Sequence, residues 1–176
     1  LGLHLDGARL FNALVAKGES PKQYGEVFNT ISVCLSKGSG TPMGSVLIGD
    51  EKLMKKAMRV RKVLGGGMRQ IGFMAAAGLY ALENNVERLA EDHQRAQELA
   101  KTLSEQTYVK EVEPVETNII IFYLTEGINE VDFLKRLEDC GVIISGMGQG
   151  KLRIVTHLCY TQEMHETFTQ VLKELV

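Results

Sequence analysis

Apolar residues recur with two different periods along the first half of the chain. The leucines among the first five residues alternate with small or polar ones, and this period of two predicts an opening strand over 1–6. β-branched residues predict a second strand over 30–36, and a third short strand is predicted over 44–49. Apolar residues three and four positions apart predict the helices. These cover 9–17, a short turn opened by Ser20 and Pro21, 51–62, 68–82 and 86–105.

Shorter elements follow one another from Tyr108 to the end of the chain. Strands are predicted over 109–112, 118–124, 142–145 and 152–156, and helices over 130–140 and 161–175. A unit of this size can bury a modest core of its own. We place the boundary near Asn84, so the predicted fold class is α/β, with one domain over 1–84 and a small C-terminal α/β domain over 85–176.

Composition and charge restrict the classes of partner. The chain has 176 residues, of which 44% are hydrophobic and 24% charged, as in an ordinary globular protein. The net charge is -2, and acidic and basic residues are interspersed, which argues against nucleic acid or an anionic membrane as the main partner. No apolar run approaches the roughly 20 residues that span a bilayer. We therefore expect no nucleic-acid and no membrane partner.

Cysteine and histidine positions argue against disulfides and metal sites. The three cysteines, Cys34, Cys140 and Cys159, form no C-x-x-C pair, which favours a reducing compartment. The expected location is the cytoplasm, with a mitochondrial location left open. The histidines show no metal-ligand spacing, so no metal is expected.

Two residues of opposite charge follow predicted strands. Asp6 ends the opening strand, and Lys37 lies between the strand over 30–36 and a Gly-Ser-Gly turn. Ligands of α/β sheets gather at the carboxyl ends of strands, and a pyridoxal phosphate enzyme needs an acid beside the ring nitrogen and a lysine for the aldehyde. Spacing alone leaves a second interpretation open, in which Asp6 is a turn or cap residue and Lys37 is simply solvated.

Four motifs in order strengthen the first interpretation. They are His-Leu-Asp-Gly-Ala-Arg at 4–9, Ser-Val-Cys-Leu-Ser-Lys-Gly at 32–38, Gly-Gly-Gly-Met-Arg-Gln at 65–70 and Arg-Ile-Val-Thr-His at 153–157. Together they resemble the low-specificity L-threonine aldolases, a pyridoxal phosphate family with the aspartate aminotransferase-like fold. The resemblance implies that 1–84 is the C-terminal part of the cofactor-binding large domain, and that the small C-terminal domain follows.

The resemblance also implies roles for individual residues. Lys37 is similar to the family's Schiff-base lysine, and Asp6 to the partner of the pyridinium nitrogen. Arg9 and Arg153 resemble the pair that holds the substrate carboxylate, a task suited to the two-pronged guanidinium group. His157 follows Arg153 along the chain and is expected to be structural rather than the catalytic base.

Two further basic residues match positions near the cofactor phosphate at a subunit boundary. These are Lys62 and Arg69, and the match implies a homodimer or homotetramer. For Arg69, a surface position at the start of a helix stays open as an alternative.

The chain departs from the family pattern in two places. The residues after Lys37 read Gly-Ser-Gly-Thr-Pro-Met-Gly-Ser, where the family pattern has a leucine near Ser39 and Ala-Pro-Val at 41–43, which is expected to alter loop packing. The family's phosphate-holding turn and ring-stacking histidine, expected upstream of the Asp6 strand, are absent from these 176 residues. Because the sequence begins with Leu1 and alternates at once, we expect it to start inside a fold.

The activity implied is retro-aldol cleavage of threonine or allo-threonine, a β-hydroxy-α-amino acid substrate, to glycine and acetaldehyde. That reaction belongs to threonine catabolism and glycine formation. Two alternatives stay open at this point. One is a different pyridoxal phosphate reaction, catalysed by another lyase or a transaminase, and the other is an inactive fragment or isoform that acts only by association.

Overall fold

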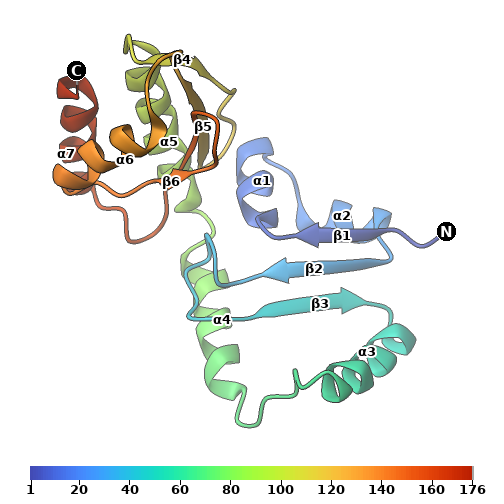
Figure 1. Cartoon of the computed structure of the whole chain (residues 1–176). Coiled ribbons are helices and arrows are strands. Elements are labelled where there is room, and N and C mark those ends of the chain that lie inside the picture. Colours follow the sequence, from blue (N-terminus) through green and yellow to red (C-terminus); the bar gives the residue numbers. More distant parts are fainter. Residues whose placement is uncertain (176) are drawn as a thin grey trace. The chain divides into compact units, whose positions relative to one another are not determined.

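The computed structural model describes residues 1–175, and the chain divides into two compact units, Leu1–Leu89 and Ala90–Val176 (Figure 1). The predicted α/β class is confirmed, because each unit combines strands and helices. Unit 1 contains β1 (His4–Gly7), α1 (Leu10–Lys17), α2 (Pro21–Val27), β2 (Thr30–Cys34), β3 (Ser45–Gly49), α3 (Glu51–Val63) and α4 (Gly72–Asn84). None of the described helices has the length and apolar character needed to cross a membrane.

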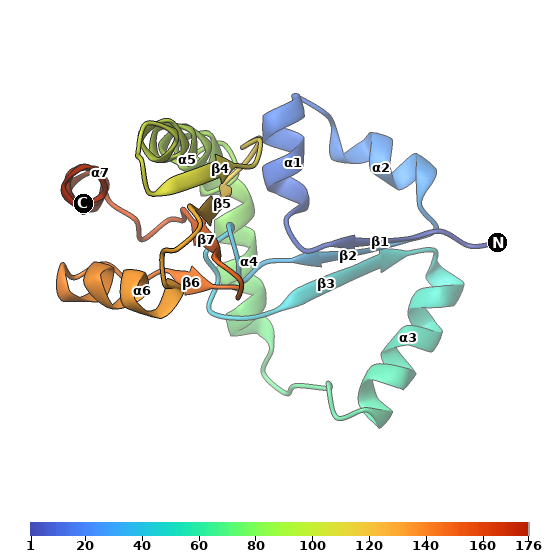
Figure 2. The ribbon, with the colours of Figure 1, turned by 45° about the horizontal axis from the view of Figure 1, so that its top comes forward.

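The three strands of unit 1 form one sheet in the order β1-β2-β3. β1 and β2 are parallel, and β3 is antiparallel to β2. The chain between the parallel strands forms α1 and α2, which lie together on one side of the strands in Figure 2. Ile31 and Val33 of β2 are buried against Leu10 and Leu14 of α1. Because side chains alternate along a strand, Ser32 and Cys34 lie on the opposite face of this sheet.

Local signals set the helix ends that the sequence predicted. Ser20 and Gln23 form a reciprocal capping box at the start of α2. The Asp50 carboxylate accepts a hydrogen bond of 2.8 Å from the Leu53 N–H and caps α3. These contacts involve residues three apart in sequence, and for that reason a single sequence predicts them.

Helix α4 begins later than predicted. The expected start near Met68 is wrong, because α4 begins at Gly72 and the segment before it is irregular. Gly65 and Gln70 have φ values of 79° and 52°, in the left-handed region that a helix cannot continue through. The long predicted helix is therefore preceded by an exposed connection.

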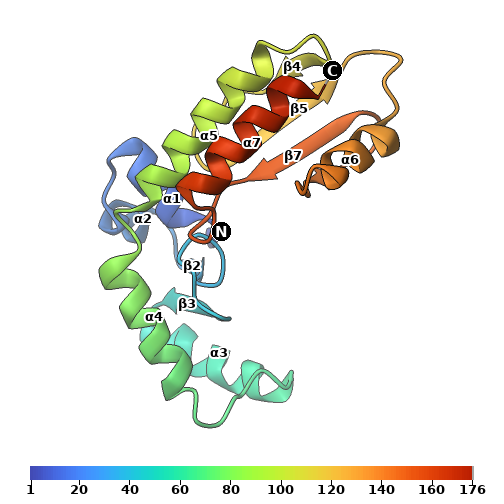
Figure 3. The same cartoon turned by 90° about the vertical axis from the view of Figure 1, so that its left-hand side faces the viewer.

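Unit 2 is a four-stranded antiparallel sheet with its helices on one face. Its elements are α5 (Leu89–Ser104), β4 (Val109–Val112), β5 (Ile119–Leu124), α6 (Glu130–Asp139), β6 (Ser145–Gly146), β7 (Lys151–Val155) and α7 (Gln162–Glu174), and the strand order is β4-β5-β7-β6. Figure 3 shows α5 and α7 side by side, and His165 of α7 lies 2.8 Å from the Glu98 carboxylate of α5. The predicted strand over 142–145 is wrong apart from Ser145.

The core of unit 2 explains its alternating pattern. Ile120 and Phe122 of β5 and Leu152 of β7 are fully buried against Leu99 of α5 and Leu172 of α7. Burying such side chains stabilises the folded state by roughly 1.5–3 kcal/mol each. The residues between them on β5 and β7 point to the other face, which no helix of unit 2 covers.

Candidate active site

Asp6 lies near the carboxyl end of β1 with its side chain exposed. It stands opposite Ser32 of β2, so both side chains lie on the face of the sheet away from α1 and α2. The next residue, Gly7, permits the close approach of the two strands, because a Cβ atom at this position would lie 2.6 Å from the Ser32 carbonyl oxygen. The glycine after Asp6 is therefore required by packing.

Lys37 lies in a loop that is closed by hydrogen bonds at its base and tied down at its centre. The Leu35 N–H donates to the Gly44 carbonyl oxygen at 3.0 Å, which brings the two ends of the loop together. The buried Asn85 amide donates to the Ser39 carbonyl oxygen at 2.8 Å. The loop thus holds the exposed Lys37 on an anchored backbone.

Cys34, at the end of β2, lies on the same face of the sheet as Asp6 and three residues before Lys37. Its sulfur is 3.5 Å from the Ser36 hydroxyl, and its strand partner is Ser45 of β3. Burial raises the pKa of the Cys34 thiol, but hydrogen bonding to Ser36 and Ser45 and the charge of Lys37 outweigh this, so its pKa lies below the ordinary value. Because β1 and β2 are parallel, Lys37, which follows the carboxyl end of β2, lies toward the same end of the sheet as Asp6.

The side chains of Asp6 and Lys37 are both open to a ligand. Among the described residues, 1–175, neither side chain forms a hydrogen bond or ion pair. A carboxylate and an amine near the same end of one sheet, without a bond between them, suit a ligand that carries a cationic nitrogen and an electrophilic carbon.

The other basic residues of unit 1 lie at two places. Arg9 is half-buried directly before α1, three residues after Asp6. Lys62 lies in the last turn of α3 and Arg69 in the connection to α4, and both are exposed. Within the described chain, no hydrogen bond or ion pair joins Lys62 or Arg69 to Asp6 or Lys37. Lys62 and Arg69 thus lie at the end of α3 and in the segment that follows it, and Arg9 lies directly before α1.

Arg153 lies in unit 2, on the open face of its sheet. Leu152 and Ile154 of β7 enter the core, so Arg153 points the other way. Its strand neighbours are Ile121 of β5 and Ser145 of β6. The guanidinium group has no hydrogen-bond or ion-pair partner in the part of the chain that the structure describes.

The second basic residue on this face, Lys151, is engaged. Its amine is 3.2 Å from the Glu113 carboxylate and 5.2 Å from the centre of the Tyr123 ring. The Tyr123 hydroxyl also donates to Glu113, at 2.7 Å. Hydrogen bonds from Tyr123 and Lys151 lower the pKa of the Glu113 carboxyl, and hydrogen bonding to Tyr123 and Glu113 raises the pKa of Lys151. Of the two cations on β7, Arg153 is the one left for a ligand.

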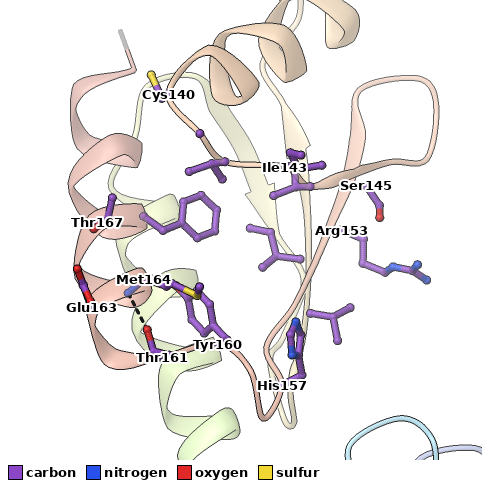
Figure 4. A pocket seen from close by; sticks show the side chains of 16 residues that line it. Cys140, Ile143, Ser145, Arg153, His157, Tyr160, Thr161, Glu163, Met164 and Thr167 are labelled. Atoms are coloured by element: carbon purple, nitrogen blue, oxygen red, sulfur yellow. Dashed lines mark hydrogen bonds between the residues drawn. The ribbon is translucent and has the colours of Figure 1, made fainter. Parts of the chain in front are cut away.

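A groove of about 780 Å³ lies in unit 2 between α7 and the segment before β6 (Figure 4). Its apolar lining includes Ile144, Ile154, Met164 and Phe168. Figure 4 shows Arg153 directed away from α7, at the margin of this groove. Arg153, Ser145 and His157 contribute to the lining of this groove, and none of the candidate residues of unit 1 does.

Sequence analysis missed three contributors. The sequence patterns select neither Cys34 nor Asn85 as a site residue, and they predict Ser145 only as part of a strand. The Asn85 contact spans 46 residues, and the pairing of Ser145 with Arg153 depends on sheet register. No short motif carries either signal. The Cys-x-Ser-Lys spacing at Cys34 is the one local signal that could have been used.

The fold and the placement of these residues define a class of protein. The chain belongs to the beta-eliminating lyase family, whose family model matches residues 1–127. It is 45% identical over 160 residues to the probable low-specificity L-threonine aldolase 2 of Arabidopsis thaliana, a match that covers 89% of this chain and 45% of that protein. It is 43% identical over 163 residues to the low specificity L-threonine aldolase of Escherichia coli strain K12, covering 93% of this chain and 47% of that protein. The chain spans about half the length of the curated relatives it matches.

Solved structures share the fold along the whole chain. A putative L-allo-threonine aldolase of Listeria monocytogenes superimposes with a TM-score of 0.80 at 21% identity, covering 100% of this chain and 52% of that one. Ornithine delta-aminotransferase of Plasmodium falciparum superimposes with a TM-score of 0.66 at 16% identity, covering 99% and 46%. The fold expected from the four motifs is therefore confirmed, as is the resemblance to the low-specificity threonine aldolases.

Proposed function

We propose that this chain forms part of a longer, pyridoxal phosphate-dependent aldehyde-lyase that cleaves threonine or allo-threonine to glycine and acetaldehyde. The observation that carries the proposal is the pair of Asp6 and Lys37, which lie near the same end of one sheet with both charges available. The names of the curated relatives support it, and their greater length supports a longer protein.

The residues of unit 1 fit the proposed cofactor. The Asp6 carboxylate would hold the protonated ring nitrogen, and the Lys37 amine would bind the aldehyde carbon. Lys62 and Arg69, which lie in one exposed segment, would serve a cofactor phosphate. When bound, pyridoxal phosphate supplies an electron sink for the charge left on Cα when the Cα–Cβ bond breaks.

The arginines would hold the substrate. Arg9 and Arg153 are proposed to bind the α-carboxylate of the β-hydroxy-α-amino acid, because guanidinium matches carboxylate in a bidentate fork. For Arg153, the support is an open position with no competing acidic partner among residues 1–175. The Lys37 amine, which is exposed, would be in a position to exchange protons with the substrate.

The protein is proposed to assemble as a homodimer or homotetramer. In unit 1, Phe73 is 77% exposed, Leu79 61% and Tyr80 64%, and the apolar residues of β3 are exposed as well. Apolar side chains in such number favour coverage by further protein. Lys62 and Arg69 would then act at the site of a neighbouring subunit. The free thiols Cys34, Cys140 and Cys159 support a location in the cytoplasm, with mitochondria as the alternative.

Two other functions have a specific observation in their favour. The same fold occurs in an aminotransferase, which supports a transaminase or another pyridoxal phosphate lyase. The chain spans about half of its relatives, which supports a fragment or isoform that is inactive alone and acts only by association. Glycine release from threonine by the complete protein distinguishes the aldolase from another pyridoxal phosphate enzyme. Cofactor uptake by the 176-residue chain alone would argue against an inactive fragment.

The test is the substitution Lys37→Ala in the complete protein. It should abolish both the absorbance of the lysine-bound cofactor near the visible edge and the formation of glycine and acetaldehyde. Lys22→Ala is the matched control, because Lys22 is an exposed lysine of α2 outside the site. A Lys37→Ala protein that keeps the absorbance would contradict the assignment of Lys37 as the cofactor-binding lysine.

A further inference from the structure

Ser145 and Arg153 occupy directly opposite positions on neighbouring strands. β6 pairs antiparallel with β7, and the register places Ser145 against Arg153. Residues opposite each other in such a pair have Cβ atoms about 4.5–5.5 Å apart on the same face of the sheet. Figure 4 shows both side chains directed away from α7. The serine hydroxyl and the guanidinium group are therefore neighbours on the open face.

Neither the Ser145 nor the Arg153 side chain bonds to another group among residues 1–175. Arg153 and Ser145 are both exposed, and within residues 1–175 neither side chain has a hydrogen-bond partner. Lys151, on the same face of the same strand, is by contrast held by Glu113 and Tyr123. The pair of donors at Ser145 and Arg153 is thus the part of this face that stays open to an anion.

A carboxylate has more acceptor positions than one arginine fills. Its two oxygens carry about four lone-pair sites, and a bidentate guanidinium uses two of them. A hydroxyl beside the guanidinium can donate to one of the remaining sites. On the other side of Arg153 stands the half-buried Ile121, whose side chain offers the anion no hydrogen-bond donor.

We propose that Ser145 is a substrate-binding residue that donates a hydrogen bond to the same carboxylate as Arg153. The proposal rests on the proposed function, since it takes the bound anion to be the α-carboxylate of an amino acid. It adds a second donor to the site, from a strand that carries none of the four family-like motifs. The site would therefore select a free carboxylate over an amide or ester, which offers fewer acceptor positions to the two donors.

The experiment compares variants of the complete, cofactor-loaded protein. Ser145→Ala should raise the KM for threonine and the dissociation constant for glycine, measured by calorimetry, about tenfold, the effect of one hydrogen bond to a charged group. kcat should stay within about twofold, because the contact is made equally before and during the reaction. Ser145→Thr, which keeps the hydroxyl, should restore both constants. Ser104→Ala, which removes a hydroxyl bonded to the Lys101 carbonyl within α5, is the control.

A second comparison tests whether the two donors share one ligand. In an Arg153→Ala background the added Ser145→Ala change should weaken glycine binding by much less than tenfold, because the carboxylate is no longer held there. Unchanged glycine binding in Ser145→Ala overturns the proposal, and so does failure of Ser145→Thr to restore it. If the unmodified protein binds glycine but cleaves no threonine, the aldolase function fails while the glycine titrations still decide the role of Ser145. Absence of glycine binding in the unmodified protein overturns both.

Discussion

The side-chain amide of Asn85 donates a hydrogen bond of 2.8 Å to the carbonyl oxygen of Ser39. The bond joins the residue that follows α4 to the loop that carries Lys37, and it is buried. A helix end and the proposed cofactor-binding loop are thereby connected. The position of Lys37 depends on a residue 48 positions further along the chain.

Substitution of Asn85 by leucine is expected to destabilise the protein and loosen the Lys37 loop. The change leaves the buried Ser39 carbonyl without its donor, which costs about 1–3 kcal/mol of unfolding free energy. Urea denaturation followed by circular dichroism measures this loss. Cofactor titration should show weaker binding as well, because Lys37 is no longer held in place.

The neighbouring residue supplies the control. Asn84 is exposed, and its amide bonds to the Tyr80 carbonyl within the same helix, so Asn84→Leu should change the unfolding free energy by about 0.5 kcal/mol or less. Equal effects of Asn84→Leu and Asn85→Leu would contradict the anchoring role of Asn85.

Gly38, directly after Lys37, is expected to tolerate no side chain. A Cβ atom there would lie 2.8 Å from the Asn12 side-chain oxygen and 3.1 Å from a methyl carbon of Leu89. Gly38→Ala should therefore lower the unfolding free energy by about 1–3 kcal/mol and reduce cofactor binding. Thermal unfolding and cofactor titration measure the two effects.

Gly25 is the matched glycine. It lies in α2, is exposed, and has no atom within 4 Å of its Cβ position, so Gly25→Ala should raise the unfolding free energy by about 0.5–1 kcal/mol. A stabilised Gly38→Ala variant would show that the loop has more room than the described contacts allow.

The reactivity of Cys34 should report the charge of Lys37. The thiolate is the form that reacts with iodoacetamide, and Ser36, Lys37 and Ser45 together place the Cys34 pKa below its ordinary value despite burial. In the cofactor-free protein, Lys37→Ala removes a positive charge that favours the thiolate. The midpoint of the alkylation rate against pH should therefore move to higher pH.

Peptide mass spectrometry distinguishes Cys34 from the exposed Cys140 and Cys159 in this experiment. Lys22→Ala, remote from the thiol, should leave the Cys34 midpoint where it is. An identical midpoint in the Lys37→Ala and unmodified proteins would show that the charge of Lys37 does not affect the pKa of Cys34.

Predictions from local signals agreed best with the structure. The helix predicted over 51–62 begins directly after Asp50, which caps it through a contact three residues away. The helix predicted over 9–17 ends at Gly18, which has a φ of 66° in the left-handed region. Both signals depend on the chain immediately around the residue.

Predictions that depend on distant partners were incomplete. Val142, Ile143 and Ile144 have high β propensity, yet only Ser145 and Gly146 pair with β7, because strand length is set by register with a partner elsewhere in the chain. Asp6 and Lys37 could be selected from sequence because each follows a strand, and their chemical roles stay predictions. Asn85 and Ser145 could not, because their significance comes from the residue across from each of them.

The ion pair between Lys151 and Glu113 has a consequence for ligands that approach from a distance. The Glu113 carboxylate compensates the charge of Lys151 at close range, so Arg153 is the cation of β7 that has no acidic partner among the described residues. An amino acid anion that diffuses toward β7 is therefore attracted mainly to Arg153 and less to Lys151. Removing the charge of Glu113 would leave Lys151, two residues from Arg153, as a second cation that competes for the anion.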